Sequence, residues 1–79
     1  MNDLKTYKYV QPTSYRIGDK LYYRSMFSDK YIEVEIIDIY IDMPYRLGYE
    51  TVIDVKAVNS DTVYKVILSD DGYRLVQKI

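Results

Sequence analysis

The stretch YIEVEIIDIYID, residues 31–42, decides the fold of this chain. Its apolar residues first occupy even positions, from Ile32 to Ile36, and then odd positions, from Ile37 to Ile41. Alternation with a period of two indicates a β-strand with one buried face. A change of phase indicates a bulge or sharp bend, because one extra residue moves every later side chain to the other face. The stretch therefore predicts a long strand that bends near Ile36 and Ile37 and can serve two parts of a small barrel.

Four further runs around this stretch have the composition of short strands, and turn-forming residues separate them. They cover residues 19–25, 49–58, 62–68 and 73–79. The segment Ser69-Asp70-Asp71-Gly72 predicts a tight hairpin, with Gly72 in a left-handed conformation. In the last run, Tyr73, Leu75 and Ile79 are predicted to face together. No stretch shows the 3.6-residue period of a helix.

The first 14 residues are a separate segment that ends in the breaker Pro12 followed by Thr13 and Ser14. Tyr7 and Tyr9 alternate with Lys8 and Val10, so residues 1–14 are predicted to form either an N-terminal arm or an extra strand. With 79 residues the chain has room for one domain. We therefore predict a single all-β domain over residues 15–79, with five strands.

The composition argues against catalysis. The chain has no cysteine and no histidine, which removes thiolate chemistry, disulfides and the usual general base near neutral pH. Glu33 and Glu35 share a strand face, but a solvated outer face explains them. Asp70 and Asp71 fit turn chemistry better than a calcium loop, which needs several spaced ligands. We expect no enzymatic activity, no cofactor and no metal.

Two further features suggest where the protein acts. A secreted domain of this size often uses disulfides, so their absence favours a reducing cytoplasm. The sequence shows no signal peptide and no apolar run of about 20 residues that could cross a bilayer. The sequence therefore predicts a cytoplasmic protein without a membrane partner.

The segment Tyr15-Arg16-Ile17-Gly18-Asp19-Lys20-Leu21-Tyr22-Tyr23 resembles the first strand of an SH3-like small barrel, in which a Gly-Asp turn often precedes an alternating strand. The rest of the chain to Ile79 is similar in layout, with a long loop, a bent second strand and a meander closed by a short hairpin. The resemblance implies a five-stranded SH3-like barrel. Without tryptophan, the chain lacks the signature for proline-rich peptides. Its size and composition also resemble accessory proteins of phages and mobile elements.

Two loops predict a binding surface, because they hold large side chains where turn-forming residues are usual. The loop after the first strand contains Met26 and Phe27, and the loop after the second contains Tyr45, Arg46 and Leu47. Tyr, Arg and Met are enriched in interface cores. In SH3-like layouts the two loops lie near one another, which would make one continuous patch. The alternatives are that Phe27 plugs the core and that the second loop caps the barrel.

The second function class is nucleic-acid binding. Aromatic residues interleaved with basic ones can stack on bases and follow phosphates, and Lys20, Tyr22, Tyr23 and Arg24 have this composition. Successive strand residues point to opposite faces, so only one of the two tyrosines can be outside. Net charge is +3 over residues 1–30, −5 over 31–55 and +1 over 56–79, so the acidic middle weakens this interpretation.

We therefore expect a protein-binding module, such as a small phage-encoded inhibitor or modulator of a host protein. A self-assembling structural subunit is a third class.

Overall fold

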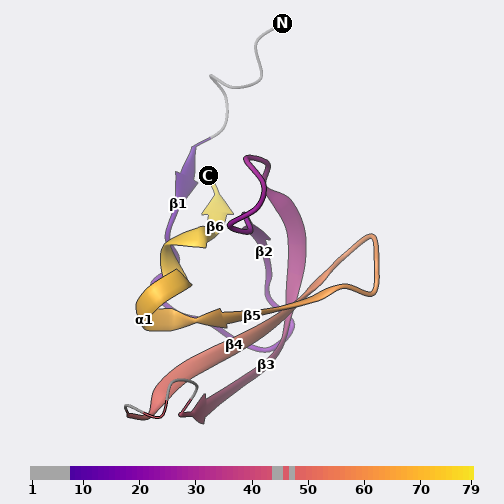
Figure 1. Ribbon diagram of the computed structural model, residues 1–79. Helices are drawn as coiled ribbons and strands as arrows, with labels where there is room; N and C mark the ends of the chain where they lie inside the picture. Colours follow the sequence, from indigo (N-terminus) through magenta and orange to yellow (C-terminus); the bar gives the residue numbers. More distant parts are fainter. Residues whose placement is uncertain (1–7, 44–45, 47) are drawn as a thin grey trace, which may run out of the picture.

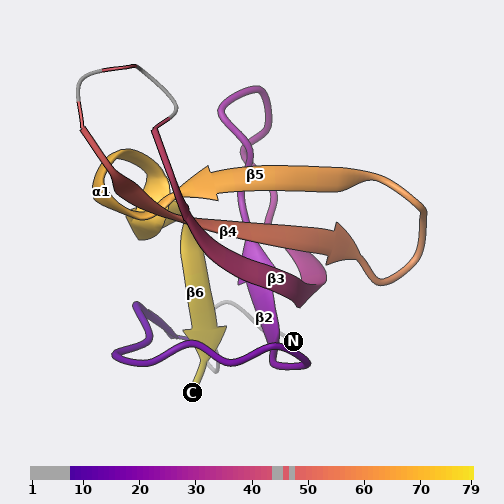
Figure 2. The same ribbon diagram turned by 90° about the horizontal axis from the view of Figure 1, so that it is seen from below.

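The computed structural model describes residues 8–43, 46 and 48–79. Its strands form one antiparallel sheet in the order β1-β6-β2-β3-β4-β5, curled into a half-barrel (Figures 1 and 2). The strands are β1 (Tyr9–Val10), β2 (Lys20–Tyr23), β3 (Ile32–Asp42), β4 (Glu50–Ala57), β5 (Val63–Ile67) and β6 (Leu75–Lys78). The all-β class is therefore correct. Among the described residues the sheet has six strands rather than five, because β1 in the N-terminal segment adds the extra strand that was one of the two alternatives for that segment.

The predicted bend in the long strand is confirmed. Ile36 pairs with Val55 and Asp38 pairs with Asp54, so Ile37 is the extra residue of a β-bulge between them. Before the bulge β3 pairs with both β2 and β4, and beyond it β3 pairs with β4 alone. Figure 1 shows β3 curving away from β2 along its length. The bulge thus lets one strand belong to both parts of the curled sheet.

The core lies on the concave face of the curled sheet. Alternate residues of β2 and the first half of β3 are buried, such as Leu21, Val34 and Ile36. They pack with residues from every strand except β1, and the buried cluster is Leu21, Tyr23, Val34, Ile36, Ile53, Val55, Val66 and Leu75. After the bulge, Ile39 packs against this cluster. The bulge therefore keeps Ile39 on the core side, in line with Val34 and Ile36, whereas Ile37 and Ile41 are exposed.

The predicted hairpin over residues 69–72 is wrong. A single helical turn, α1 (Leu68–Asp71), is followed by a 3₁₀ turn, η2 (Gly72–Arg74). Because β5 pairs with β4 whereas β6 pairs with β2 and β1, the chain must cross the end of the half-barrel here. Gly72 has a right-handed φ of −56°. A Cβ at this position would lie 3.0 Å from Leu68 Cδ1, so any larger residue would push on the Leu68 side chain, and the position requires no left-handed turn.

The ends of the chain also differ from the simple alternation. Leu75 is fully buried, but Tyr73 and Ile79 are 52% and 73% exposed, so these three residues do not face together. Tyr73 belongs to η2 and not to a strand, which removes it from the alternation. Within the N-terminal segment, Tyr9 pairs with Lys78 and so joins β1 to β6.

Candidate binding groove

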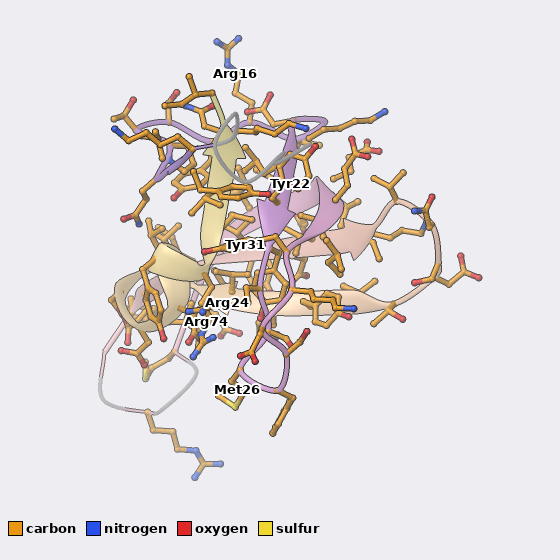
Figure 3. All side chains as sticks on the ribbon, turned by 90° about the horizontal axis from the view of Figure 1, so that it is seen from above. Arg16, Tyr22, Arg24, Met26, Tyr31 and Arg74 are labelled. Carbon is orange, nitrogen blue, oxygen red and sulfur yellow. The ribbon has the colours of Figure 1, made fainter. Side chains whose placement is uncertain are left out.

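One groove opens between the loop after β2, the strand β5 and the crossing α1–η2. Its volume is 520 Å³, and it is lined by Tyr23, Ser25, Met26, Phe27, Val63, Tyr64, Lys65, Asp71 and Arg74. We call it the Phe27 groove. Figure 3 shows Met26 at the tip of the loop, on the same side of the molecule as Arg74 and away from Arg16. Two of the residues predicted to bind a partner therefore line the same groove.

A tight turn presents Met26 and Phe27 to solvent. The backbone N–H of Ser28 donates to the Ser25 carbonyl at 3.3 Å, which places Met26 and Phe27 at the two central positions of a β-turn. The Ser25 hydroxyl also accepts from the Phe27 N–H at 3.3 Å. Met26 is 65% exposed and Phe27 is 91% exposed. Phe27 therefore does not plug the core, which excludes the alternative that the sequence left open.

The floor of the Phe27 groove is aromatic. Tyr23 and Tyr64 lie with ring centroids 4.9 Å apart and planes inclined by 43°. Tyr23 belongs to the core cluster, and Tyr64 packs against it, so the floor is part of the packed interior. Burial raises the pKa of the Tyr23 hydroxyl above its usual value of 10.0, and the carboxylate of Asp71 raises it further. The hydroxyl is therefore uncharged near neutral pH and can donate a hydrogen bond.

One end of the groove is lined by Arg74, which is hydrogen-bonded to Arg24 outside the groove. The Arg24 N–H donates to the Arg74 carbonyl at 3.1 Å, and Arg74 Nη1 donates to the Arg24 carbonyl at 3.4 Å. Arg74 Nε lies 3.8 Å from Asp71 Oδ1, close enough for an ion pair but too far for a hydrogen bond. The Nε atoms of both arginines are buried and have no hydrogen-bond acceptor within the described residues. Two hydrogen bonds thus join the arginines, one between their backbones and one from the Arg74 side chain, beside the Asp71 carboxylate.

A second surface, on the outer face of the sheet, gathers aromatic and basic side chains. Tyr9 stacks on Tyr31 with ring centroids 4.4 Å apart and meets Tyr22 edge-on at 5.8 Å. We call these three residues the tyrosine cluster; Figure 3 shows Tyr22 and Tyr31 near one another. Arg24 lies 5.8 Å from the Tyr31 ring centre, and Lys78 lies 5.2 Å from that of Tyr22. Cations at this range are attracted to the ring faces.

The residues predicted for nucleic acid divide between these two surfaces. Tyr22 and Arg24 belong to the outer surface, but Tyr23 is buried in the core at 7% exposure. Lys20 is exposed and sits opposite Glu35 in the neighbouring strand. Glu33 likewise sits opposite Tyr22. The outer surface therefore mixes charges and is not a uniformly basic strip.

The second predicted loop lies elsewhere. It follows β3, whereas the Met26 loop precedes β3, so the two loops lie at opposite ends of an 11-residue strand (Figure 1). Arg46 is exposed with φ +60°, and it does not line the Phe27 groove. Tyr45 and Leu47 lie outside the described residues. Of the five predicted contact residues, the structure brings together Met26 and Phe27.

Sequence reasoning missed most of the groove. Val63 and Tyr64 are predicted from the sequence only as strand residues, and nothing in the sequence assigns a role to Arg74. Their positions follow from the crossing over residues 68–74, which brings Arg74 beside Arg24. Tyr9 and Tyr31 were missed in the same way, because their contact joins two segments far apart in the chain. The one available signal was the excess of tyrosine, 11 of 79 residues.

No protein-family model matches the chain, and neither the curated proteins nor the solved structures contain a significant match. Within the described residues, no three His, Cys, Asp or Glu side chains come close enough to hold a metal ion. No helix among these residues is long and apolar enough to cross a membrane. The Phe27 groove and the tyrosine cluster are the two candidate functional surfaces of the described residues.

Proposed function

We propose that this chain is a non-enzymatic protein-binding module and that the Phe27 groove is its contact site. The observation that carries the proposal is the β-turn that holds Met26 and Phe27 in solvent above an aromatic floor. A Phe side chain that is 91% exposed gains nothing for the fold, and its burial by a partner removes a large apolar area from water. Adjacent apolar, aromatic and arginine side chains have the composition of an interface hot spot.

The SH3-like barrel is the finer form of this proposal. It is supported by the bent β3, by the order β6-β2-β3-β4-β5, and by the pairing of the last strand with β2. The resemblance of the composition to phage accessory proteins favours a bacterial host protein as the partner, which the module would inhibit or modulate in the cytoplasm. The Phe27 groove replaces the continuous two-loop patch as the proposed surface.

The test compares two double variants with matched exposure. Met26→Ser/Phe27→Ser removes the apolar lip of the groove, and Ile41→Ser/Tyr49→Ser removes two side chains that are 70% and 75% exposed outside it. The protein is immobilised, a partner is captured from an extract of the native host, and its affinity is measured by calorimetry. We expect the groove variant to bind at least about 10-fold more weakly, as hot-spot residues do. The control variant should bind like wild type.

Two results would contradict the proposal. Equal losses in both variants would show that exposed apolar area binds without a specific site. Unchanged affinity in the groove variant would remove the Phe27 groove from the interface. Melting temperatures should stay close to wild type in both variants, since all four side chains are mainly exposed.

Nucleic-acid binding is the second candidate, and the tyrosine cluster with Arg24 and Lys78 favours it. Its rings pack on one another, and Glu33 and Glu35 lie across from Tyr22 and Lys20, so we rank it second. Fluorescence anisotropy with a labelled single-stranded oligonucleotide at two salt concentrations tests it. A nucleic-acid binder should lose affinity steeply with salt, and Tyr22→Ala should weaken it. Binding of this kind without any dependence on Phe27 would make this candidate the leading one.

A further inference from the structure

The strand β5 is an edge strand, and its free edge borders the Phe27 groove. It is the last strand in the sheet order and pairs only with β4. The Ala57 N–H donates to the Thr62 carbonyl at 2.9 Å, and this register makes Tyr64 and Val66 the residues that bond to β4. In antiparallel pairing the intervening residues turn their backbone groups away. Val63 and Lys65 therefore point their N–H and C=O groups outward.

These outward groups are not used elsewhere in the described part of the chain. No backbone or side-chain hydrogen bond reaches them from another segment of residues 8–43, 46 and 48–79. Ile67 is the next residue after Val63 and Lys65 whose backbone groups point outward, and it is the N-cap of α1. The free edge therefore ends where α1 begins. A row of unpaired backbone donors and acceptors is a template for another strand.

We propose that the Phe27 groove binds an extended segment of the partner polypeptide, which hydrogen-bonds to Val63 and Lys65 and so adds a strand to β5. This proposal rests on the proposed protein-binding function and specifies the form of the partner. An added strand lies about 4.8 Å from its neighbour, which places it between β5 and the turn that holds Phe27. Its main chain supplies affinity, and alternate side chains fill the groove.

The groove also favours a particular sequence in that segment. Its apolar lining by Met26, Phe27, Val63 and the two floor tyrosines fits an aromatic or aliphatic side chain, and 520 Å³ is within the range of about 300–1,000 Å³ for ligand pockets. The charged residues that line it already have partners. Arg74 Nε lies 3.8 Å from Asp71 Oδ1, and Lys65 Nζ lies 5.7 Å from the centre of the Tyr40 ring. The groove therefore favours an apolar side chain over a charged one.

The other end of the sheet is a poorer template. The strand β1 has only two residues, Tyr9 and Val10, whereas β5 has five. The Phe27 groove does not reach Tyr9 or Val10. An added strand at β1 would therefore gain few main-chain hydrogen bonds and would not place its side chains in the Phe27 groove.

The probe is a displayed library of random ten-residue peptides, selected on the wild-type protein and then resynthesised. We expect selected peptides to carry apolar residues at alternate positions and to lose binding to the Met26→Ser/Phe27→Ser variant. Single N-methyl groups are then placed along the best peptide. Methylation at alternate positions should weaken binding at least 10-fold, because a strand bonds to its neighbour through every second residue. If methylation at consecutive positions weakened binding equally, or if no methyl group changed the affinity, strand addition would be overturned.

A pair of variants at Val63 tests the protein side. Val63→Pro removes the outward N–H, and the β4–β5 ladder should survive because Val63 does not bond to β4 and prolines occur at edges and at first residues of strands. Val63→Ala keeps the N–H and loses a comparable apolar area. We expect the proline variant to bind the peptide at least 10-fold more weakly than the alanine variant. If Val63→Pro lowers the melting temperature, the same comparison is made at the next outward position, with Lys65→Pro and Lys65→Ala.

The outcomes separate this inference from the function on which it rests. Loss of host-partner binding in Met26→Ser/Phe27→Ser with full binding in both proline variants would retain the groove and reject the added strand. Failure to select any peptide that depends on Met26 and Phe27 would reject the extended occupant. Unchanged host-partner binding in the Met26→Ser/Phe27→Ser variant would reject the proposed function itself.

Discussion

Replacing Tyr9 by alanine tests whether the tyrosine cluster holds β1 on the barrel. Tyr9 is 39% exposed, so about three fifths of a tyrosine burial of about 200 Å² is lost, or about 120 Å². At about 25 cal/mol per Å² this is about 3 kcal/mol, an upper bound because the unfolded chain already buries part of it. The two ring contacts add about 0.5–1.5 kcal/mol each. We expect the free energy of unfolding to fall by about 2–4 kcal/mol.

Urea denaturation followed by circular dichroism measures this change, with Tyr49→Ala as the control. Tyr49 is 75% exposed and has no ring contact with the described residues, so its loss should cost no more than about 0.5 kcal/mol. A double-mutant cycle of Tyr9→Ala with Tyr31→Ala isolates the stacked pair, for which we expect a coupling of about 0.5–1.5 kcal/mol. A Tyr9→Ala variant no less stable than Tyr49→Ala would refute the reasoning.

Three further predictions concern the core, the bulge and pH. Leu75→Ala, at a fully buried position, should lower the free energy of unfolding in urea by about 2–5 kcal/mol. Ile41→Ala, at 70% exposure, should lower it by less than about 0.5 kcal/mol. Equal losses in the two variants would contradict the assigned core. Deleting Ile37 removes the extra residue of the bulge and leaves the β3–β4 pairs in place. The deletion should lower the melting temperature because the bend in β3 is lost. An unchanged melting temperature would show that the fold does not need the bulge. Because the pKa of Tyr23 is raised in the folded protein, this hydroxyl loses its proton at lower pH in the unfolded chain than in the folded one. Its contribution to stability is therefore fully present below about pH 10 and is lost as pH rises through the pKa of the folded state. Tyr23→Phe should flatten this fall between about pH 9 and pH 11 in denaturation curves, and a parallel fall in the variant would assign the effect to other groups.

The Phe27 groove places function and stability on different residues. Met26 and Phe27 are held by a local turn and contribute little to the core, so they can change without unfolding the chain. The floor residue Tyr23 belongs to both the groove and the core cluster. Variants at Tyr23 would therefore mix effects on binding and stability, which is why the tests above use the lip and the edge strand.

The sequence alone determined the features that depend on neighbouring residues. The alternation in residues 31–42 and its change of phase located a bulge or bend near Ile36 and Ile37, because a side chain's face in a strand follows from its position in the chain. The unusual apolar residues Met26 and Phe27 in a short loop identified the apolar lip of the groove, because loop composition is also read from neighbouring residues. The absence of His and Cys narrowed the possible chemistry, because composition alone decides which side chains are available to react or to bind a metal.

Only the tertiary structure decided what joins distant segments. The segment Ser69-Asp70-Asp71-Gly72 suits a tight hairpin by composition, yet it forms helical turns because β6 must reach β2 on the far side of the half-barrel. That crossing also brings Arg74 to Arg24 and leaves β5 as an open edge. Short-range preferences amount to about 1 kcal/mol per residue, which is less than the gain from burying a side chain such as Leu75. Packing across the sheet therefore overrides the local turn preference and creates the groove.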